Sequence, residues 1–174
     1  MGLEENKAVV RRYVEAGVNA HDPAVVEAVV HPDVVVHYGA RTIHGRAAYQ
    51  RGNAAGLQAF PDWQLTVESL IAEGDLVALR GTVRATHRGP FDAGPHGVIP
   101  PTGAAVTVTQ QALARLQGGQ LIELWVERDS LTLLQQLGAL ASAAAAGSPD
   151  LAQTASLEHE ATSAPSLLPE VDTA

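Results

Sequence analysis

Apolar and polar residues change their spacing about one third of the way along the chain. In the earlier part the apolar positions recur every three or four residues, which predicts helices over residues 4–18, 23–30 and 46–58. Asp22 is well suited to cap the second of these helices, and the proline after it suits the first helical turn. The β-branched run at residues 33–38 predicts a strand between the helices.

The later part of the chain alternates between apolar and polar residues, as strands with one buried face do. Glycine-containing turns of the kind that close hairpins separate the alternating segments. A leucine-rich segment after the last of them predicts a short final helix. The predicted fold is α+β, with a curved antiparallel sheet wrapped round N-terminal helices to form a cone with an internal pocket. The predicted strands cover residues 63–72, 76–87, 105–116 and 120–128.

The composition divides the chain of 174 residues into two parts. Residues 1–140 hold the predicted elements and form one α+β cone domain. Residues 141–174 are rich in Ala, Ser, Thr and Pro and hold five acids but no Lys or Arg, so we expect a mostly disordered tail. The formal charge is −8, and without the five acids of the tail it is about −3, so the cone domain is close to neutral.

Composition and motifs exclude several classes of function. An acidic chain lacks the basic face that a nucleic-acid partner needs, and no apolar run reaches the length of a membrane span. There is no cysteine for disulfides or thiolate chemistry, and the seven histidines show no spacing typical of metal ligands. Phosphate-binding loops and the serine-hydrolase motif are missing too. We therefore expect a cytoplasmic protein with no metal or organic cofactor, no nucleic-acid partner and no membrane association.

Several short motifs are spread over residues 4–138. They are FPD at 60–62, GD at 74–75, PPTG at 100–103 and WVERDSLTLLQQLG at 125–138. Together they resemble the SnoaL-like polyketide cyclases, also called ester cyclases, of the nuclear-transport-factor-like α+β cone superfamily. The resemblance implies a cofactor-independent cyclase that uses acid/base catalysis on an apolar oxygenated intermediate, in polyketide or other secondary metabolism. Epoxide opening and aldol-type ring closure are both compatible with it.

The chain departs from the family where the chemistry is expected. Counted back from the motif's end, the resemblance places the catalytic Asp of the founding aldol cyclase on Val126 and its polar partner on Ala112. Both residues are apolar here, which favours epoxide opening or another cyclisation over aldol closure. A one-residue bulge would bring Glu127 to the inner position instead. In a regular strand, Glu127 shares the opposite face with Glu123 and Trp125.

Five polar residues are candidates for acid/base chemistry. Glu127 would gain a raised pKa in an apolar pocket and so suit a general base or acid, or it is a surface glutamate. Asp129 is either a second such group or the N-cap of the final helix. His37 and His87 could shuttle a proton near neutral pH, and Tyr38 could donate a hydrogen bond to an oxyanion. His37 and Tyr38 are adjacent on a strand, so only one of them is expected to face the cavity.

Other residues are candidates for binding a small apolar organic substrate. Arg80 is either the buried partner of a carboxylate such as Asp129 or an outward-facing arginine. Four aromatic residues are expected to form the pocket wall or to belong to the core: Trp125, Trp63, Phe60 and Tyr13.

Other functions remain open at this point. A non-catalytic ligand-binding or dimerisation module would hold no titratable pair in contact inside the pocket. An epoxide hydrolase would need an Asp–Arg–Asp cluster around a water, to which Arg80 and Asp129 could contribute. A ketosteroid-isomerase-like enzyme is a further alternative. An apolar outer face of the sheet would favour a homodimer that forms through the sheet.

Overall fold

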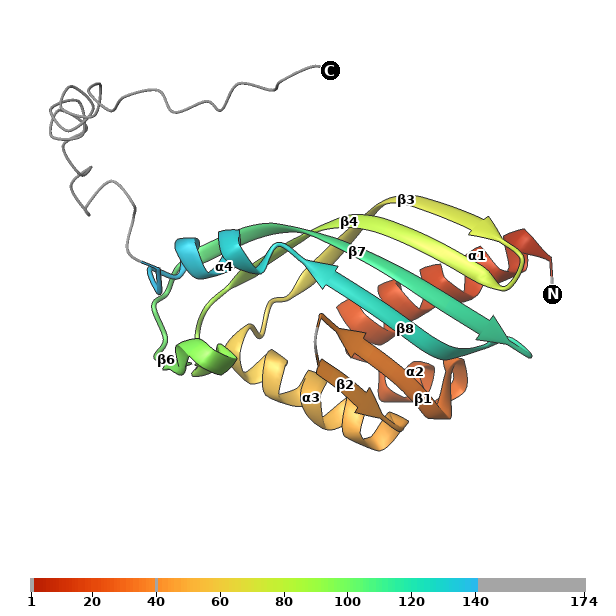
Figure 1. The fold of residues 1–174 in the computed structure, drawn as a ribbon, viewed down its shortest axis with the longest axis horizontal. Coiled ribbons are helices and arrows are strands. Elements are labelled where there is room, and N and C mark those ends of the chain that lie inside the picture. Colours follow the sequence, from red (N-terminus) through yellow and green to blue (C-terminus); the bar gives the residue numbers. More distant parts are fainter. Residues whose placement is uncertain (1, 40, 141–174) are drawn as a thin grey trace, which may run out of the picture. The chain divides into compact units, whose positions relative to one another are not determined.

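The computed structural model describes residues 2–39 and 41–140, and Figure 1 shows their fold. The helices are α1 (Leu3–Arg12), the π-helix η1 (Tyr13–Asn19), α2 (Pro23–Val29), α3 (Arg46–Ala59), the 3₁₀-helix η2 (Gly94–His96) and α4 (Ser130–Gln136). The strands are β1 (Val30–Tyr38), β2 (Arg41–His44), β3 (Gln64–Glu73), β4 (Leu76–Thr86), β5 (Phe91–Asp92), β6 (Val98–Ile99), β7 (Ala105–Gln117) and β8 (Gln120–Arg128). The predicted tail at residues 141–174 lies outside the described residues.

Six strands form one sheet in the order β2-β1-β8-β7-β4-β3. β1 runs parallel to β8, and the other neighbouring strands are antiparallel. The expectation of an antiparallel sheet is therefore wrong for one pairing. β1 follows helix α2 and is not joined to β8 by a hairpin, so no tight turn forces these two strands to run antiparallel.

The sheet curves over the N-terminal helices, and α1, α2 and α3 lie against its concave side (Figure 1). The inner face of β4 shows how the alternating sequence produces this arrangement, because Val77, Leu79 and Val83 are buried while Ala78 and Arg80 between them are exposed. Valines from α1, α2 and β1 complete the core between helices and sheet. The predicted α+β cone is confirmed.

Most predicted elements are present within a few residues of their expected limits. The carboxylate of Asp22 caps α2, as predicted, by accepting a hydrogen bond from the backbone N–H of Ala24 at 2.9 Å. Strand β2 was not predicted, because its four residues are mostly exposed and include one apolar side chain, Ile43. The two-residue strands β5 and β6 are too short to produce a pattern. No helix among the described residues is long and apolar enough to span a membrane.

Candidate active site inside the cone

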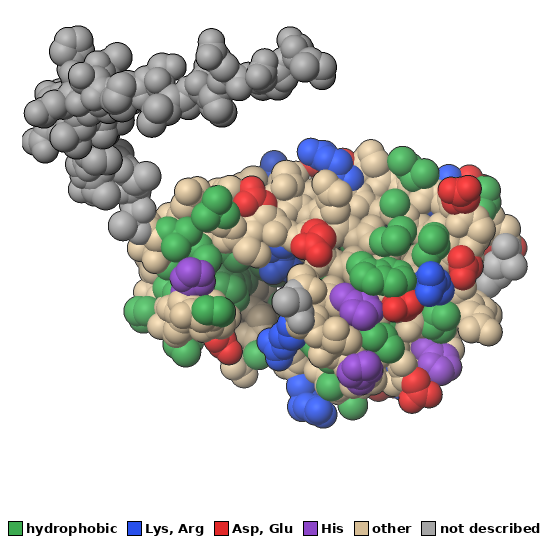
Figure 2. All heavy atoms as spheres, in the orientation of Figure 1, with side chains coloured by type: hydrophobic (Ala, Val, Ile, Leu, Met, Phe, Trp, Pro, Cys, Tyr) green, Lys and Arg blue, Asp and Glu red, His purple; other side chains and the backbone are tan. Residues whose placement is uncertain are grey.

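A cavity of about 290 Å³ lies between the inner face of the sheet and the helices η1 and α3. Most of its wall is apolar, with Val14, Leu79, Leu124 and Val126 among the lining residues. Phe91, from the short strand β5, lines it as well. Figure 2 shows a hollow on one face of the molecule, beside the tip of β1, with Lys or Arg side chains at its edge. A largely apolar cavity with a few polar groups is typical of a small-molecule site.

All three tyrosines of the chain line this cavity, although they come from three different elements. Tyr13 lies in the π-helix η1, Tyr38 at the end of β1 and Tyr49 in α3. The hydroxyls of Tyr13 and Tyr49 hydrogen-bond to each other. Burial raises the pKa of Tyr13, and the neighbouring Tyr49 and Tyr38 raise it further. Burial and Tyr49 also raise the pKa of Tyr38, so both phenols keep their protons at neutral pH and can donate hydrogen bonds.

Arg128, at the end of β8, brings a positive charge to the same cavity. Its Nε and Nη2 atoms donate to Oε1 of Gln110 at 3.1 and 3.0 Å. Its guanidinium carbon lies 4.3 Å from the ring centroid of Trp63, a cation–π contact. Burial lowers the pKa of Arg128, and the nearby Tyr38 and Tyr49 oppose this effect. An arginine nevertheless remains charged in proteins.

The position on which the resemblance places the catalytic Asp of the founding aldol cyclase is apolar and faces inward. Val126 and Ala112 both line the cavity and lie opposite each other in the β7–β8 ladder. The irregularity of this ladder lies at the other end, between Arg115 and Leu116, and pairing is regular around Glu127. Glu127 therefore points outward and is exposed, and the expectation that it could reach the cavity through a bulge is wrong. Among the residues that the structure describes, no Asp or Glu lines the cavity.

Asp129 also lies outside the cavity and is exposed. Its carboxylate caps α4 by accepting a hydrogen bond from the backbone N–H of Thr132 at 2.9 Å. Hydrogen bonds from Thr132 lower the pKa of Asp129, which keeps it ionised and acceptor-only. The structure thus places Asp129 as a helix cap, the second of the two interpretations.

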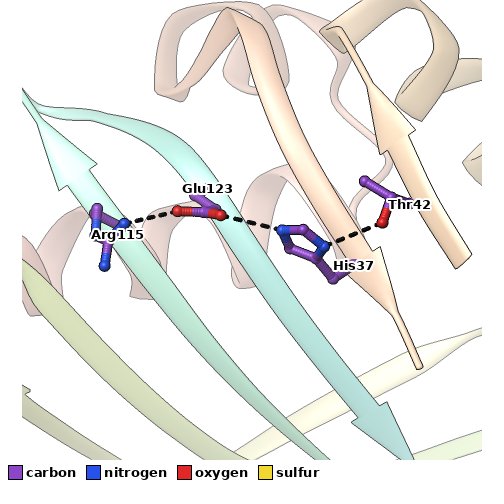
Figure 3. A network of polar contacts seen from close by, with 4 residues as sticks. All are labelled: His37, Thr42, Arg115 and Glu123. Atoms are coloured by element: carbon purple, nitrogen blue, oxygen red, sulfur yellow. Dashed lines mark hydrogen bonds and ion pairs between the residues drawn. The ribbon is translucent and has the colours of Figure 1, made fainter. Parts of the chain in front are cut away.

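His37 lies on the outer face of the sheet, away from the cavity. Its Nε2 atom is 3.1 Å from Oε1 of Glu123, and Oε2 of Glu123 accepts a hydrogen bond from Arg115 at 2.7 Å (Figure 3). Its ring stacks on Trp125 with centroids 5.4 Å apart. Trp125 is therefore an outer-face residue and not part of the pocket wall, as strand alternation with Val126 requires.

Arg80 belongs to the outer face too. It forms an ion pair with Glu68 of β3. Asp129 caps α4 instead of pairing with Arg80. The Asp–Arg–Asp cluster that an epoxide hydrolase would need is therefore not formed by these residues.

His87 is fully buried but does not line the cavity. Its ring stacks on Phe60 at 5.1 Å and contacts the edge of Phe91, so it lies behind two residues of the cavity wall. Its Nδ1 atom lies 3.0 Å from the hydroxyl of Thr102 and accepts from the backbone N–H of Thr102 at 3.3 Å. Within the described part of the chain, Nε2 of His87 has no hydrogen-bond partner. These contacts hold the loop after β4 against the cavity wall.

The other expected wall residues, Phe60, Trp63 and Tyr13, line the cavity. Sequence reasoning missed Tyr49, Gln110 and Arg128. The alternation of β8 carried the signal for Arg128, because it lies two residues after Val126 and shares its face. Gln110 pairs with Arg128 in the ladder, so the same face follows for it. Within residues 2–39 and 41–140, no three His, Asp or Glu side chains are placed to share a metal ion.

Comparisons with known proteins agree with the observed fold and identify the family. The sequence model of the SnoaL-like polyketide cyclases matches residues 7–137. AclR of Streptomyces galilaeus, a proposed hydroxylase, is 34% identical with a TM-score of 0.69, over 80% of this chain and 99% of AclR. A proposed SnoaL-like polyketide cyclase of Jannaschia sp. CCS1 is 26% identical with a TM-score of 0.71, over 79% of this chain and 94% of that one.

IdmH of Streptomyces antibioticus, a proposed polyketide cyclase, is 28% identical with a TM-score of 0.65, over 76% of this chain and 98% of IdmH. No protein among the curated sequences matches the chain. The family and these structures support a cyclase-type function. The chain belongs to the SnoaL-like polyketide cyclase family.

Proposed function

We propose that the protein is a cofactor-independent cyclase that closes a ring in an apolar oxygenated intermediate held inside the cone, as a step of polyketide or other secondary metabolism. The observation that carries this proposal is the convergence of Tyr13, Tyr38 and Tyr49 in an apolar cavity. Phenol O–H groups in the cavity can donate to an oxygen that gains negative charge during the reaction. Arg128 adds a positive charge to the same cavity from the end of β8.

The phenol pair suits a ring closure in which one proton is both released and taken up. The hydroxyls of Tyr13 and Tyr49 share one hydrogen bond, which uses one of their two O–H protons and leaves the other for the substrate. In the opening of an epoxide by a hydroxyl of the same molecule, a C–O bond forms as the epoxide C–O bond breaks. The proton of the attacking hydroxyl then passes to the epoxide oxygen, and the phenol pair can relay it.

Epoxide opening fits these residues better than aldol closure. Aldol chemistry begins when a base removes a proton from carbon, and the resemblance implies that this base is a carboxylate in the founding aldol cyclase. None of the described acids lines the cavity, and phenols with raised pKa values are poor bases at neutral pH. The same absence of a carboxylate among the lining residues favours one rival, a ligand-binding module without catalysis.

The test is turnover of a panel of epoxy-alcohols, aromatic polyketide esters, steroids and fatty acids. Wild-type protein is compared with Tyr49→Phe, Tyr13→Phe and Tyr38→Phe, and Glu127→Gln and Asp129→Asn are the controls. We expect an epoxy-alcohol to be cyclised, with kcat lowered about 10²–10³-fold in Tyr49→Phe and unchanged in both controls. Ligands that raise the melting temperature of every variant without conversion would instead support the binding module.

We also propose that two copies pair through the outer face of the sheet. Trp125 and Leu113 lie opposite each other in the β7–β8 ladder on this face, and both are half-buried in the isolated chain. Light scattering on wild-type protein and on Leu113→Glu tests this pairing. A dimer that becomes a folded monomer in the variant is expected, and a monomeric wild-type protein would refute it.

A further inference from the structure

The guanidinium of Arg128 is held in place but has unused donors. Gln110 contacts one edge of the group through Oε1, and the ring of Trp63 covers one face. Of the five N–H donors of an arginine, these contacts use one on Nε and one on Nη2. Across the described residues, no other hydrogen bond or ion pair involves the guanidinium of Arg128. Arg128 lines the cavity, and the edge formed by Nη1 and Nη2 keeps donors that have no partner among the described residues.

The groups around Arg128 do not balance its charge. Tyr38 is a neutral donor at physiological pH because its pKa is raised, and the side chain of Gln110 is neutral. Arg41 lines the same cavity and adds a second positive charge. The remaining titratable residues of the lining are not carboxylates, and they are His21, Tyr13 and Tyr49. Since no acid among residues 2–39 and 41–140 lines the cavity, no carboxylate of the cavity wall offsets the charge of Arg128.

A cation inside an apolar cavity is costly unless an anion pairs with it. Gln110 even orients its amide so that its oxygen faces Arg128, which leaves the Nε2 donors of Gln110 without a hydrogen-bond partner in the described part of the chain. The polar end of the cavity thus offers many donors and few acceptors. A ligand that supplies a negative charge and two acceptor oxygens would complete it.

We propose that Arg128 and Gln110 form a carboxylate-binding site, so that the substrate of this protein is an organic acid and not a neutral ester. The planar edge of a guanidinium matches the two oxygens of a carboxylate in parallel hydrogen bonds. The surrounding walls and the volume of about 290 Å³ fit an apolar body of one or two rings. This inference rests on the proposed function for the location of the site, but it concerns binding and does not depend on turnover.

Matched acids and esters test the proposal. We would measure the dissociation constants of 4-phenylbutanoate, 2-naphthoate and their methyl esters by calorimetry, with 3-phenylpropyl phosphate as a further anion. Wild-type protein should bind at least one acid about 10- to 100-fold more tightly than its ester. If no acid binds more tightly than its ester, the proposal is wrong. A phosphate that binds more tightly than every acid would also overturn the assignment to carboxylates.

Variants then place the preference on Arg128. Arg128→Gln should bring the acid to the affinity of its ester, and Arg128→Lys should keep part of the preference because it retains the charge but loses the planar edge. Arg80→Gln is the control, since it removes an arginine from the outer face. A preference for the acid that survives in folded Arg128→Gln would refute the site.

The two proposals can fail separately. Tight binding of acids that are never converted would leave the carboxylate site standing and remove the cyclase. Cyclisation of a neutral ester that is unaffected in Arg128→Gln would leave the cyclase standing and remove the carboxylate site.

Discussion

The two tryptophans of the chain each lie beneath an arginine, one inside the cone and one on its outer face. Arg115 lies over Trp125 at 5.3 Å and forms ion pairs with Glu123 at 2.7 Å and Asp75 at 3.6 Å. Arg128 lies over Trp63 at 4.3 Å but has the neutral Gln110 as its hydrogen-bond acceptor.

The Arg115–Trp125 pair belongs to a network that stabilises the fold, whereas the Arg128–Trp63 pair leaves a charge available for a ligand. On the outer face the charges satisfy one another, and His37 joins the same network (Figure 3). In the cavity the charge is fixed in position by neighbours that do not neutralise it. A buried polar group whose hydrogen-bond donors have no partner in the protein is suited to bind a ligand. Charged groups that are already paired with one another need no ligand to account for them.

The largest expected effect comes from giving Arg128 a carboxylate of its own. Val126→Asp places an acid two residues away on the same face of β8. The new Asp should pair with Arg128 and lower the affinity for acids about 100-fold or more, because an internal anion then competes with the ligand. Calorimetry with the same acids measures this loss. Undiminished binding in folded Val126→Asp would show that the acids bind elsewhere, and Glu127→Asp is the matched outer-face control.

The two tryptophans should differ in what their removal costs. Trp63→Ala removes a cavity wall that contacts Phe60 and Arg128, and it should destabilise the fold by about 2–3 kcal/mol. Trp125→Ala removes a half-buried outer residue and should cost about 1 kcal/mol. Urea unfolding at one protein concentration compares them. Equal costs would mean that the inner pair is no better packed than the outer one.

The phenols of the cavity predict how stability depends on pH. The pKa values of Tyr13 and Tyr38 are raised in the folded protein, so the unfolded chain loses these protons first as pH rises. Their contribution is complete below about pH 10, the usual tyrosine pKa, and above it stability should fall by up to about 1.4 kcal/mol per pH unit for each phenol. Urea unfolding at pH 9, 10 and 11 measures the slope.

Tyr38→Phe is the matched variant for this slope, because it removes one of the two titrating phenols and keeps the ring. Its stability should fall less steeply above pH 10 than that of the wild type. An identical slope in both proteins would show that Tyr38 titrates in the folded state as it does in water.

The smallest expected effect is on the outer face. Arg115→Gln removes two partly exposed ion pairs, which solvent screens, so the loss of stability should stay below about 1 kcal/mol. Ligand affinity should not change. A loss of acid binding as large as that in Arg128→Gln would contradict the separation of the two faces.

The fold was predictable because its signals are local. Alternation marked the long strands, helical spacing marked α1 and α3, and Asp22 and Asp129 were identified as caps, the latter as one of two interpretations. The parallel pairing of β1 with β8 was not predictable in this way, since it joins segments that are far apart in the sequence and are not connected by a turn. Strand β2 carries too little apolar pattern to be detected.

The site was harder to predict because it depends on which face each residue occupies. The sequence suggested the carboxylates near the end of β8 as acid/base groups, but the regular β7–β8 ladder turns Glu127 outward and Arg128 inward. The convergence of three tyrosines from η1, β1 and α3 is a tertiary property that no spacing along the chain reveals. Strand alternation alone could have identified Arg128, once Val126 was taken as an inner residue.

The central claim is that ligands bind inside the cone beside Arg128, and tryptophan fluorescence tests it most directly. The variant Trp125→Phe retains Trp63 under Arg128, and Trp63→Phe retains Trp125 under Arg115. Titration with 4-phenylbutanoate should change the emission of the protein that retains Trp63 and leave that of the protein that retains Trp125 unchanged. A response of Trp125 alone, or saturation of binding with unchanged Trp63 emission, would contradict the account.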